Sequence, residues 1–254
     1  MNINSNIGSN ISSNIISKLN SSIDLWIWDF DDTLINTEAY DKDMSPKAIR
    51  LRSPSELSQE FPNRRFFVDL VINIIKSGKQ VAIASFGTRY IIDAYMKRLF
   101  GNNQKYFTEY NTLVIRRDPV TNIPIEHPDN KNYMIRELMR RYNIKDSRRV
   151  AFFDDQKGNI KAARKMGIIS IQIPGKFSRE RQEGDRNSLF SEKHLTKVYR
   201  HLGVPINKSR IIENFDLNRI TKKDSQILKK RTKYLLFGAI TILCYFIYRR
   251  SKKI

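Results

Sequence analysis

The sequence contains a single cysteine, Cys244, in 254 residues. One cysteine excludes an internal disulfide framework and a cysteine-rich zinc site, so a bound metal would be held mostly by oxygen atoms. A disulfide is not needed either, because a chain of this length with 40% hydrophobic residues can bury a substantial core. This composition excludes a wholly disordered chain and a polytopic membrane protein.

Charge is nearly missing from the amino terminus, where Lys18 is the one charged side chain of residues 1–22. No basic stretch precedes an apolar one there, so the sequence does not indicate a secretory signal. The segment contains six Asn and seven Ser. We expect residues 1–22 to form a mostly disordered leader, in which scattered Ile and Leu side chains could form one amphipathic turn.

Acidic residues are in the minority, 26 against 46 Lys and Arg, which gives a formal net charge of +20. Most of the excess follows residue 175, where 20 basic residues face 7 acidic ones. Such a basic region favours a phosphate-rich partner, either nucleic acid or an anionic membrane. No nucleic-acid-binding motif accompanies it, and a lysine bias in the composition explains the charge equally well.

Short apolar runs alternate with helical periods from residue 23 to residue 175. This pattern is typical of a doubly wound, Rossmann-like α/β domain, in which helices cover both faces of a parallel sheet. The expected strands are residues 25–30, 81–84, 113–115, 150–153 and 168–173. The expected helices are residues 66–75, 90–100, 134–142 and 160–166. Residues 176–233 are polar and basic, and we expect one more helix there, around residues 194–202, followed by a linker.

Residues 234–248 contain no charged side chain and lie between two flanks of four basic residues each. A helix of this length rises about 22 Å, which is short of the ~30 Å hydrocarbon core, but snorkelling flanks could close the gap. We expect a transmembrane tail anchor over residues 234–248 and a basic tail over residues 249–254. With a span so late in the chain, we expect the domain over residues 23–175 to remain in the cytosol. An amphipathic or core helix is the alternative.

Carboxylates follow two of the expected strands. Asp29 and Asp31 come at the end of the first, and Asp154 and Asp155 follow the strand over residues 150–153. Open α/β sheets bind ligands at the carboxyl ends of their strands. An extended strand would place Asp29 and Asp31 on one side, where they suit a shared cation and phosphoryl group. Acidic pairs at strand ends also occur where they only meet solvent or cap a turn.

Two further residues suit an anion at the same edge. Ser85 ends the strand over residues 81–84, and the following Phe-Gly-Thr offers exposed backbone N–H groups. Lys131 lies just before the expected helix over residues 134–142. A cation there is unfavourable with respect to the helix dipole unless it serves an anion.

These residues, in this order, resemble the four motifs of the haloacid dehalogenase-like (HAD) superfamily of phosphatases and phosphotransferases. The resemblance covers about residues 23–174. Residues 29–33 (Asp-Phe-Asp-Asp-Thr) match the first motif, Ser85 the second, Lys131 the third and residues 152–160, with their paired Asp, the fourth. The resemblance implies that Asp29 is the nucleophile that forms an aspartyl-phosphate.

In the same resemblance, Asp31 protonates the leaving oxygen and then activates water, while Ser85 and Lys131 hold the phosphoryl oxygens. It also implies a bound Mg²⁺. The implied ligands of this ion are Asp29, the backbone carbonyl of Asp31, Asp154 and Asp155. Because a dehalogenase does not need the acid at the position of Asp31, the resemblance favours a phosphatase.

Neither insertion point for a substrate-covering cap holds a large cap. About 28 residues lie between the first motif and residue 62, near which the next helix is expected to begin, and Lys131 follows Ser85 by 46 positions. An open site could admit a phosphate on a macromolecule, although small caps also occur on enzymes for small metabolites. Several arginines either line the approaches or are ordinary solvated surface. They are Arg50, Arg52, Arg64, Arg65, Arg116 and Arg117.

Two functions of different classes remain. The first is a membrane-anchored, Mg²⁺-dependent phosphatase acting on phosphate monoesters. The second is a catalytically inactive HAD-fold membrane adaptor that binds nucleic acid or anionic lipid through its basic tail. The complete acidic motifs favour the enzyme, because a binding protein has no need to keep Asp31.

Overall fold

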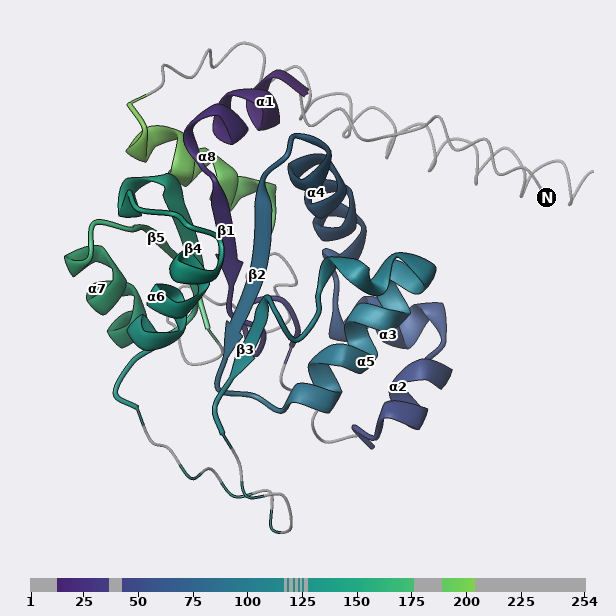
Figure 1. Ribbon diagram of the computed structural model, residues 1–254. Helices are drawn as coiled ribbons and strands as arrows, with labels where there is room; N and C mark the ends of the chain where they lie inside the picture. Colours follow the sequence, from purple (N-terminus) through teal and green to yellow (C-terminus); the bar gives the residue numbers. More distant parts are fainter. Residues whose placement is uncertain are drawn as a thin grey trace, which may run out of the picture. The chain divides into compact units, whose positions relative to one another are not determined.

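The computed structural model of the protein describes residues 13–36, 43–116, 128–175 and 189–203, together with residues 118, 121, 123 and 125 (Figure 1). The first part of the expected leader, most of the basic region over residues 176–233, the expected span over residues 234–248 and the basic tail lie outside these residues. What the sequence predicts for them stays a prediction.

A sheet of five parallel strands forms the centre of the described residues, in the order β3-β2-β1-β4-β5. The strands are β1 (Leu25–Trp28), β2 (Gln80–Ser85), β3 (Thr112–Val114), β4 (Val150–Asp154) and β5 (Ile169–Gln172). All five expected strands are present. Because every neighbouring pair is parallel, the carboxyl ends of the strands share one edge, and β1 lies in the middle of it.

Helices cover both faces of this sheet. The helices are α1 (Ser13–Ser22), α2 (Pro46–Leu51), α3 (Pro54–Glu60), α4 (Arg64–Lys76), α5 (Arg89–Phe100), α6 (Asn132–Arg141), α7 (Lys157–Lys165) and α8 (Glu192–His201), with short 3-10 turns at Gly101–Tyr106 and Ser147–Arg149. In Figure 1, α6 and α7 lie on one side of the sheet and α4 on the other. The sequence pattern thus predicted the doubly wound α/β fold correctly.

Alternation along β1 divides the core into two chemically different halves. Leu25 and Ile27 pack with aliphatic side chains of α6 and α7. Trp28 faces the other way, 5.9 Å from the Phe153 ring of β4 and 5.3 Å from the Phe67 ring of α4. Burial on both faces explains why the strands read as continuous apolar runs.

The amino-terminal helix α1 corrects one expectation. We expected disorder over residues 1–22, but Ser13–Ser22 is helical, and Leu19 is fully buried. The amide of Asn20 also donates to the Ser77 hydroxyl at 3.0 Å. Docking of one apolar side chain against the domain supplies the stability that this polar segment lacks by itself.

The carboxyl end of the domain also differs from the expected boundary at residue 175. The expected helix around residues 194–202 is present as α8, but it belongs to the core, because Leu195 and Val198 are buried. The Phe190 ring, just before it, lies 4.7 Å from the Phe153 ring, and the Phe190 N–H donates to the Thr33 carbonyl at 2.8 Å. The sequence predicted this helix but not its buried face, because the residues around it are mostly polar and basic.

Two short helices that the sequence did not reveal follow the first motif. Each begins at a serine cap: Ser45 accepts from the Ala48 N–H and Ser53 from the Glu56 N–H, both at 3.2 Å. These helices, α2 and α3, are small, as expected for a site without a large cap. The buried Glu60 carboxylate at the end of α3 accepts a hydrogen bond from the Tyr95 hydroxyl of α5 at 2.8 Å. This bond holds α3 against the domain.

The described residues have two further general properties. None of their helices combines the length and the apolar character that crossing a bilayer requires.

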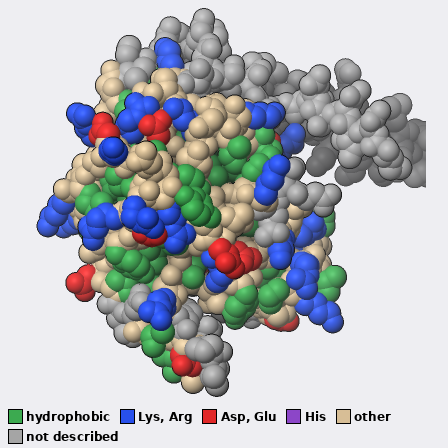
Figure 2. Space-filling view, in the orientation of Figure 1, with side chains coloured by type: hydrophobic (Ala, Val, Ile, Leu, Met, Phe, Trp, Pro, Cys, Tyr) green, Lys and Arg blue, Asp and Glu red, His purple; other side chains and the backbone are tan. Residues whose placement is uncertain are grey.

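Figure 2 shows Lys and Arg side chains spread over the visible face, with acidic side chains among several of them. The nucleic-acid and membrane alternatives therefore gain no support from this face.

A buried histidine in α8 gives the fold a testable pH dependence. His194 is fully buried, and its Nδ1 accepts from the Ser191 N–H at 3.0 Å. Burial, with nearby Lys197 and Lys193, lowers the pKa of His194 from 6.5 to about 3. Between these two pKa values His194 is protonated in the unfolded chain but neutral in the folded protein. As the pH falls through this range, His194 therefore lowers the free energy of unfolding by up to about 1.4 kcal/mol for each pH unit.

We expect His194→Gln to flatten the dependence of unfolding free energy on pH between about pH 6.5 and 4.5 relative to the wild type. Urea unfolding at a series of pH values measures this slope. The matched control is His201→Gln, which removes an exposed histidine from the last turn of the same helix. An unchanged slope in His194→Gln would contradict the prediction.

Candidate active site

A pocket of about 360 Å³ is lined by the residues that follow β1, β2 and β4 and by the start of α6 and α7. Its lining residues are Asp29, Asp31, Asp32, Phe86, Asp129, Lys131, Asp155, Gln156, Gly158 and Asn159. The strands end at this edge because the apolar runs end there and polar side chains begin. Four of the six residues expected at the site line this pocket directly.

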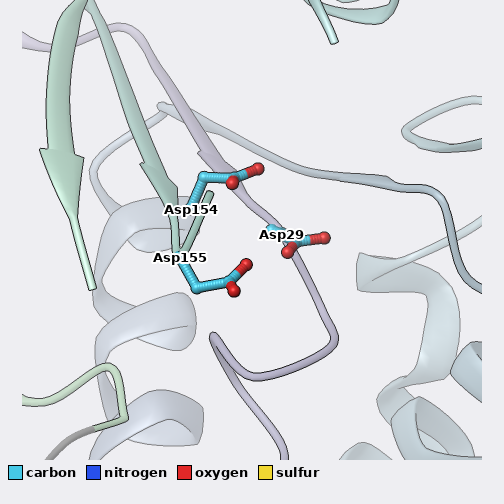
Figure 3. A group of neighbouring side chains, drawn as sticks. All are labelled: Asp29, Asp154 and Asp155. Atoms are coloured by element: carbon cyan, nitrogen blue, oxygen red, sulfur yellow. The ribbon is translucent and has the colours of Figure 1, made fainter. Parts of the chain in front are cut away.

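The carboxylates of Asp29, Asp154 and Asp155 lie near one another and extend to the same side (Figure 3). Each offers one oxygen, and these oxygens lie within 4.8 Å of one another. Asp29 follows β1, where its N–H donates to the Phe153 carbonyl of β4 at 2.8 Å. Pairing of the two strands therefore fixes the Asp29 backbone beside the paired Asp of the fourth motif.

Lys131 lies between two of these carboxylates. Its Nζ atom is 2.5 Å from Asp29 Oδ1 and 2.7 Å from Asp154 Oδ2, and the side chain is only 2% exposed. The residue immediately precedes α6, as the sequence predicted, and its carbonyl accepts the first bond of that helix from the Ile135 N–H. A lysine at the start of a helix is unfavourable unless an anion lies beside it, and the carboxylates of Asp29 and Asp154 are these anions.

The site holds more negative charge than Lys131 neutralises. Burial raises the pKa of Asp29 well above its ordinary value; Lys131 opposes this shift, and Asp154 adds to it. Burial and the charge of Asp154 raise the pKa of Asp155 to about 6. Burial disfavours the charge of Lys131, but Asp154 and Asp29 outweigh it and raise the pKa of Lys131. A divalent cation among these all-oxygen donors would relieve the repulsion, so the residues fit a Mg²⁺ site.

Asp31 reaches the pocket by a route that the sequence did not predict. We expected an extended strand through residue 30, but β1 ends at Trp28 and a turn follows, in which the Leu34 N–H donates to the Phe30 carbonyl at 2.9 Å. The left-handed backbone of Asp32, at φ 52°, belongs to this turn. Strand alternation therefore does not explain why Asp29 and Asp31 share a pocket; the turn does.

The loop after β2 places a buried serine near Asp31. Ser85 is fully buried, and its hydroxyl oxygen accepts from the Gly87 N–H at 2.9 Å. A Cβ atom at Gly87 would lie 3.0 Å from that oxygen and would overlap Asp31 Oδ2. The glycine therefore lets the Asp31 carboxyl and the Ser85 hydroxyl approach the same point.

Several residues that hold the acidic side chains had no role assigned from the sequence, although Gln156 and Asn159 lie within the fourth motif. The Asn159 amide donates to both oxygens of Asp154 at 3.1 Å, and the Gln156 N–H donates to Asp154 Oδ1 at 2.7 Å. A Cβ at Gly175 would lie 2.7 Å from Asp155 Oδ2. The signal for Asn159 was a buried amide in the first turn of α7, but its partner depends on the tertiary fold.

The sequence left open whether several arginines line the approaches or belong to the ordinary surface, and those that the structure describes do not line this pocket. Arg64 and Arg65 line a separate pocket on α4. Arg52 pairs instead with the buried Glu60 at 2.8 Å. Arg117 lies outside the described residues. Within the described part of the chain, Lys131 is therefore the cation that lines the site.

Comparisons with known proteins add a likeness of fold. No protein-family model matches the sequence, and no curated protein matches it. CbbY from Rhodobacter sphaeroides, solved in complex with phosphate, is 15% identical, with 64% of this chain and 91% of that chain covered and a TM-score of 0.39. A predicted HAD-like family hydrolase from Porphyromonas gingivalis is 14% identical, with 62% and 94% covered and a TM-score of 0.33. At these values the likeness carries no argument about chemistry, which rests on the pocket itself.

Proposed function

We propose that the protein is a Mg²⁺-dependent phosphatase of the HAD type, which hydrolyses phosphate monoesters through an aspartyl-phosphate on Asp29. One observation carries the proposal: Asp29, Asp154 and Asp155 converge around the buried Lys131 at the carboxyl ends of a parallel sheet. A phosphate monoester is a dianion that repels nucleophiles, so its hydrolysis needs this combination of nucleophile and countercharge.

The ion would be held by Asp29, the backbone carbonyl of Asp31, Asp154 and Asp155. Hard oxygen donors and room for retained water suit Mg²⁺. When bound, the ion would supply positive charge that offsets the charge of the phosphoryl group. Asn159 and Gln156 hold the Asp154 carboxylate in place through hydrogen bonds and so orient one ligand.

The proposed reaction consists of two displacements at phosphorus. A carboxylate oxygen of Asp29 attacks phosphorus, the bond to the leaving oxygen breaks, and Asp31 gives its proton to that oxygen. Water then attacks phosphorus, Asp31 takes the proton of the water, and the bond between phosphorus and Asp29 breaks. Inorganic phosphate leaves, and both aspartates return to their starting states. Lys131 and Ser85 would hold the phosphoryl oxygens throughout.

Asp31→Asn tests this assignment through the leaving group. Nitrophenolate departs without an acid, so the variant should complete the first displacement on p-nitrophenyl phosphate and then stall, because no base activates water. We expect a burst of about one nitrophenolate per site and a trapped phosphoenzyme in rapid-quench measurements.

With an alkyl phosphate, whose leaving oxygen needs a proton, the same variant should show no burst. Mapping of the trapped phosphate should place it on Asp29. Phosphate on a different residue, or wild-type turnover of the variant, would overturn the roles of Asp29 and Asp31. Absence of Mg²⁺-dependent hydrolysis by the wild-type protein would instead favour the inactive adaptor.

We also propose that residues 234–248 attach the protein to a membrane, with the catalytic domain in the cytosol. The uncharged run between two basic flanks supports this. The full chain should sediment with membranes after gentle lysis without detergent, and deletion of residues 231–254 should release an active domain.

A matched control keeps the length of the segment. Ile240→Lys with Ile242→Lys introduces two charges near its middle, each of which costs about 2.5–3.5 kcal/mol in a spanning helix. This variant should move to the soluble fraction. Recovery of the unaltered full chain in the soluble fraction would remove the membrane proposal.

A further inference from the structure

A second pocket, of about 410 Å³, lies among α3, α4 and α5 and shares no residue with the catalytic pocket. Arg64 and Arg65 contribute to it from the first turn of α4, and Arg98 from the last turn of α5. A single carboxylate, Asp69, is among its lining residues. The pocket therefore has an excess of positive charge.

Two of these arginines donate hydrogen bonds to groups that do not neutralise their positive charge. Arg64 donates to the Ser58 hydroxyl, and Arg98 donates to the Arg52 carbonyl at 3.2 Å. Both partners are neutral. Guanidinium groups gathered around one pocket repel one another, and an anion bound between them would relieve the repulsion.

Three aliphatic side chains also line the pocket, and we call them its floor. Leu57 of α3 is 5% exposed, while Val68 of α4 and Leu99 of α5 are half-buried. The residues that line this pocket include no aromatic ring, so the described site offers no stacking platform for a nucleic-acid base. A bilayer surface is flat and does not follow a pocket that lies among three helices. Charge and shape together favour a polypeptide with one apolar side chain.

We propose that this pocket binds a protein segment in which an aliphatic side chain is flanked by acidic residues. The aliphatic side chain would cover Leu57, Val68 and Leu99, and the flanking carboxylates would pair with Arg64 and Arg98. Planar guanidinium groups bind carboxylates through two parallel hydrogen bonds, which gives such a segment a fixed orientation. This proposal rests on the described fold and does not depend on the phosphatase function.

The experiment measures binding of a fluorescein-labelled peptide, Gly-Asp-Glu-Leu-Glu-Asp-Gly, to the full chain in mild detergent by fluorescence anisotropy. Arg98→Glu should weaken binding about tenfold, because a pairing charge becomes a repelling one. Lys97→Glu is the matched control: it makes the same charge change at the neighbouring exposed position of α5, outside the pocket. It should leave Kd within about twofold. Both variants should keep the thermal midpoint of the wild type.

A second peptide in which Ser replaces Leu tests the floor and should bind more weakly than the first. Asp29→Asn should bind the peptide as the wild type does, so a failure of this proposal is distinguishable from a failure of the phosphatase. Equal losses in Arg98→Glu and Lys97→Glu, equal affinity for the two peptides, or no binding would overturn the proposal. So would stronger, Arg98-dependent binding of single-stranded DNA or phosphatidylserine vesicles.

Discussion

Asp29→Asn is expected to abolish turnover of every phosphate monoester, with a fall in kcat of about 10⁴-fold or more. An amide cannot form the aspartyl-phosphate, and no other described carboxylate has the same relation to Lys131 and to the end of β1. The fold should persist, because Lys131 still pairs with Asp154 at 2.7 Å. Steady-state assays with an aryl and an alkyl phosphate, both in excess Mg²⁺, measure the loss.

The control for this variant is Asp146→Asn. It removes an exposed carboxylate that caps the short turn before β4, at the opposite end of that strand from the paired Asp. Its kcat should match that of the wild type. If Asp29→Asn retained substantial activity on either substrate, the nucleophile would have to be another residue.

Lys131→Met should lower the stability of the metal-free protein by about 3–5 kcal/mol, because it removes the countercharge of the buried Asp29 and Asp154 carboxylates. Excess Mg²⁺ should restore part of this loss, since the ion would replace the missing positive charge at the same carboxylates. Urea unfolding of the wild type and the variant, in chelator and in excess Mg²⁺, measures both effects.

Lys79→Met provides a comparison at a solvent-exposed pair. Lys79 lies 2.7 Å from Asp24, and both side chains are about a quarter exposed. Its removal should cost less than about 1 kcal/mol and should not respond to Mg²⁺. A loss in Lys131→Met that is equally large in chelator and in Mg²⁺ would show that this lysine acts only in packing.

The sequence predicted those parts of the fold that depend on continuous local patterns. Each strand is an apolar run because both faces of the sheet are covered, and α4 to α7 show regular helical periods. The helices α2 and α3 were missed because each is about two turns long and depends on its serine cap. The sequence allowed only one amphipathic turn in the region of α1, and it did not place α1 or α8 in the core. Single apolar side chains such as Leu19 become informative only after the domain has formed.

In the candidate site, too, some positions follow from local sequence patterns and others depend on the tertiary fold. Asp29, Asp154 and Lys131 could be placed from strand ends and helix starts, since parallel pairing brings these points together. The position of Asp31 depends on a turn with a left-handed residue, which alternation along a strand cannot describe. Asn159 needed the tertiary fold, because its contact with Asp154 joins the first turn of α7 to the end of β4.

The late position of α8 has a consequence for synthesis on the ribosome. The strands are complete in sequence at Gln172, but the Phe190 ring that covers Trp28 and Phe153 has not yet been made. At about 5–20 residues per second, the chain needs on the order of seconds to reach the end of α8. During this interval the part of the aromatic face that Phe190 contacts in the folded domain stays uncovered.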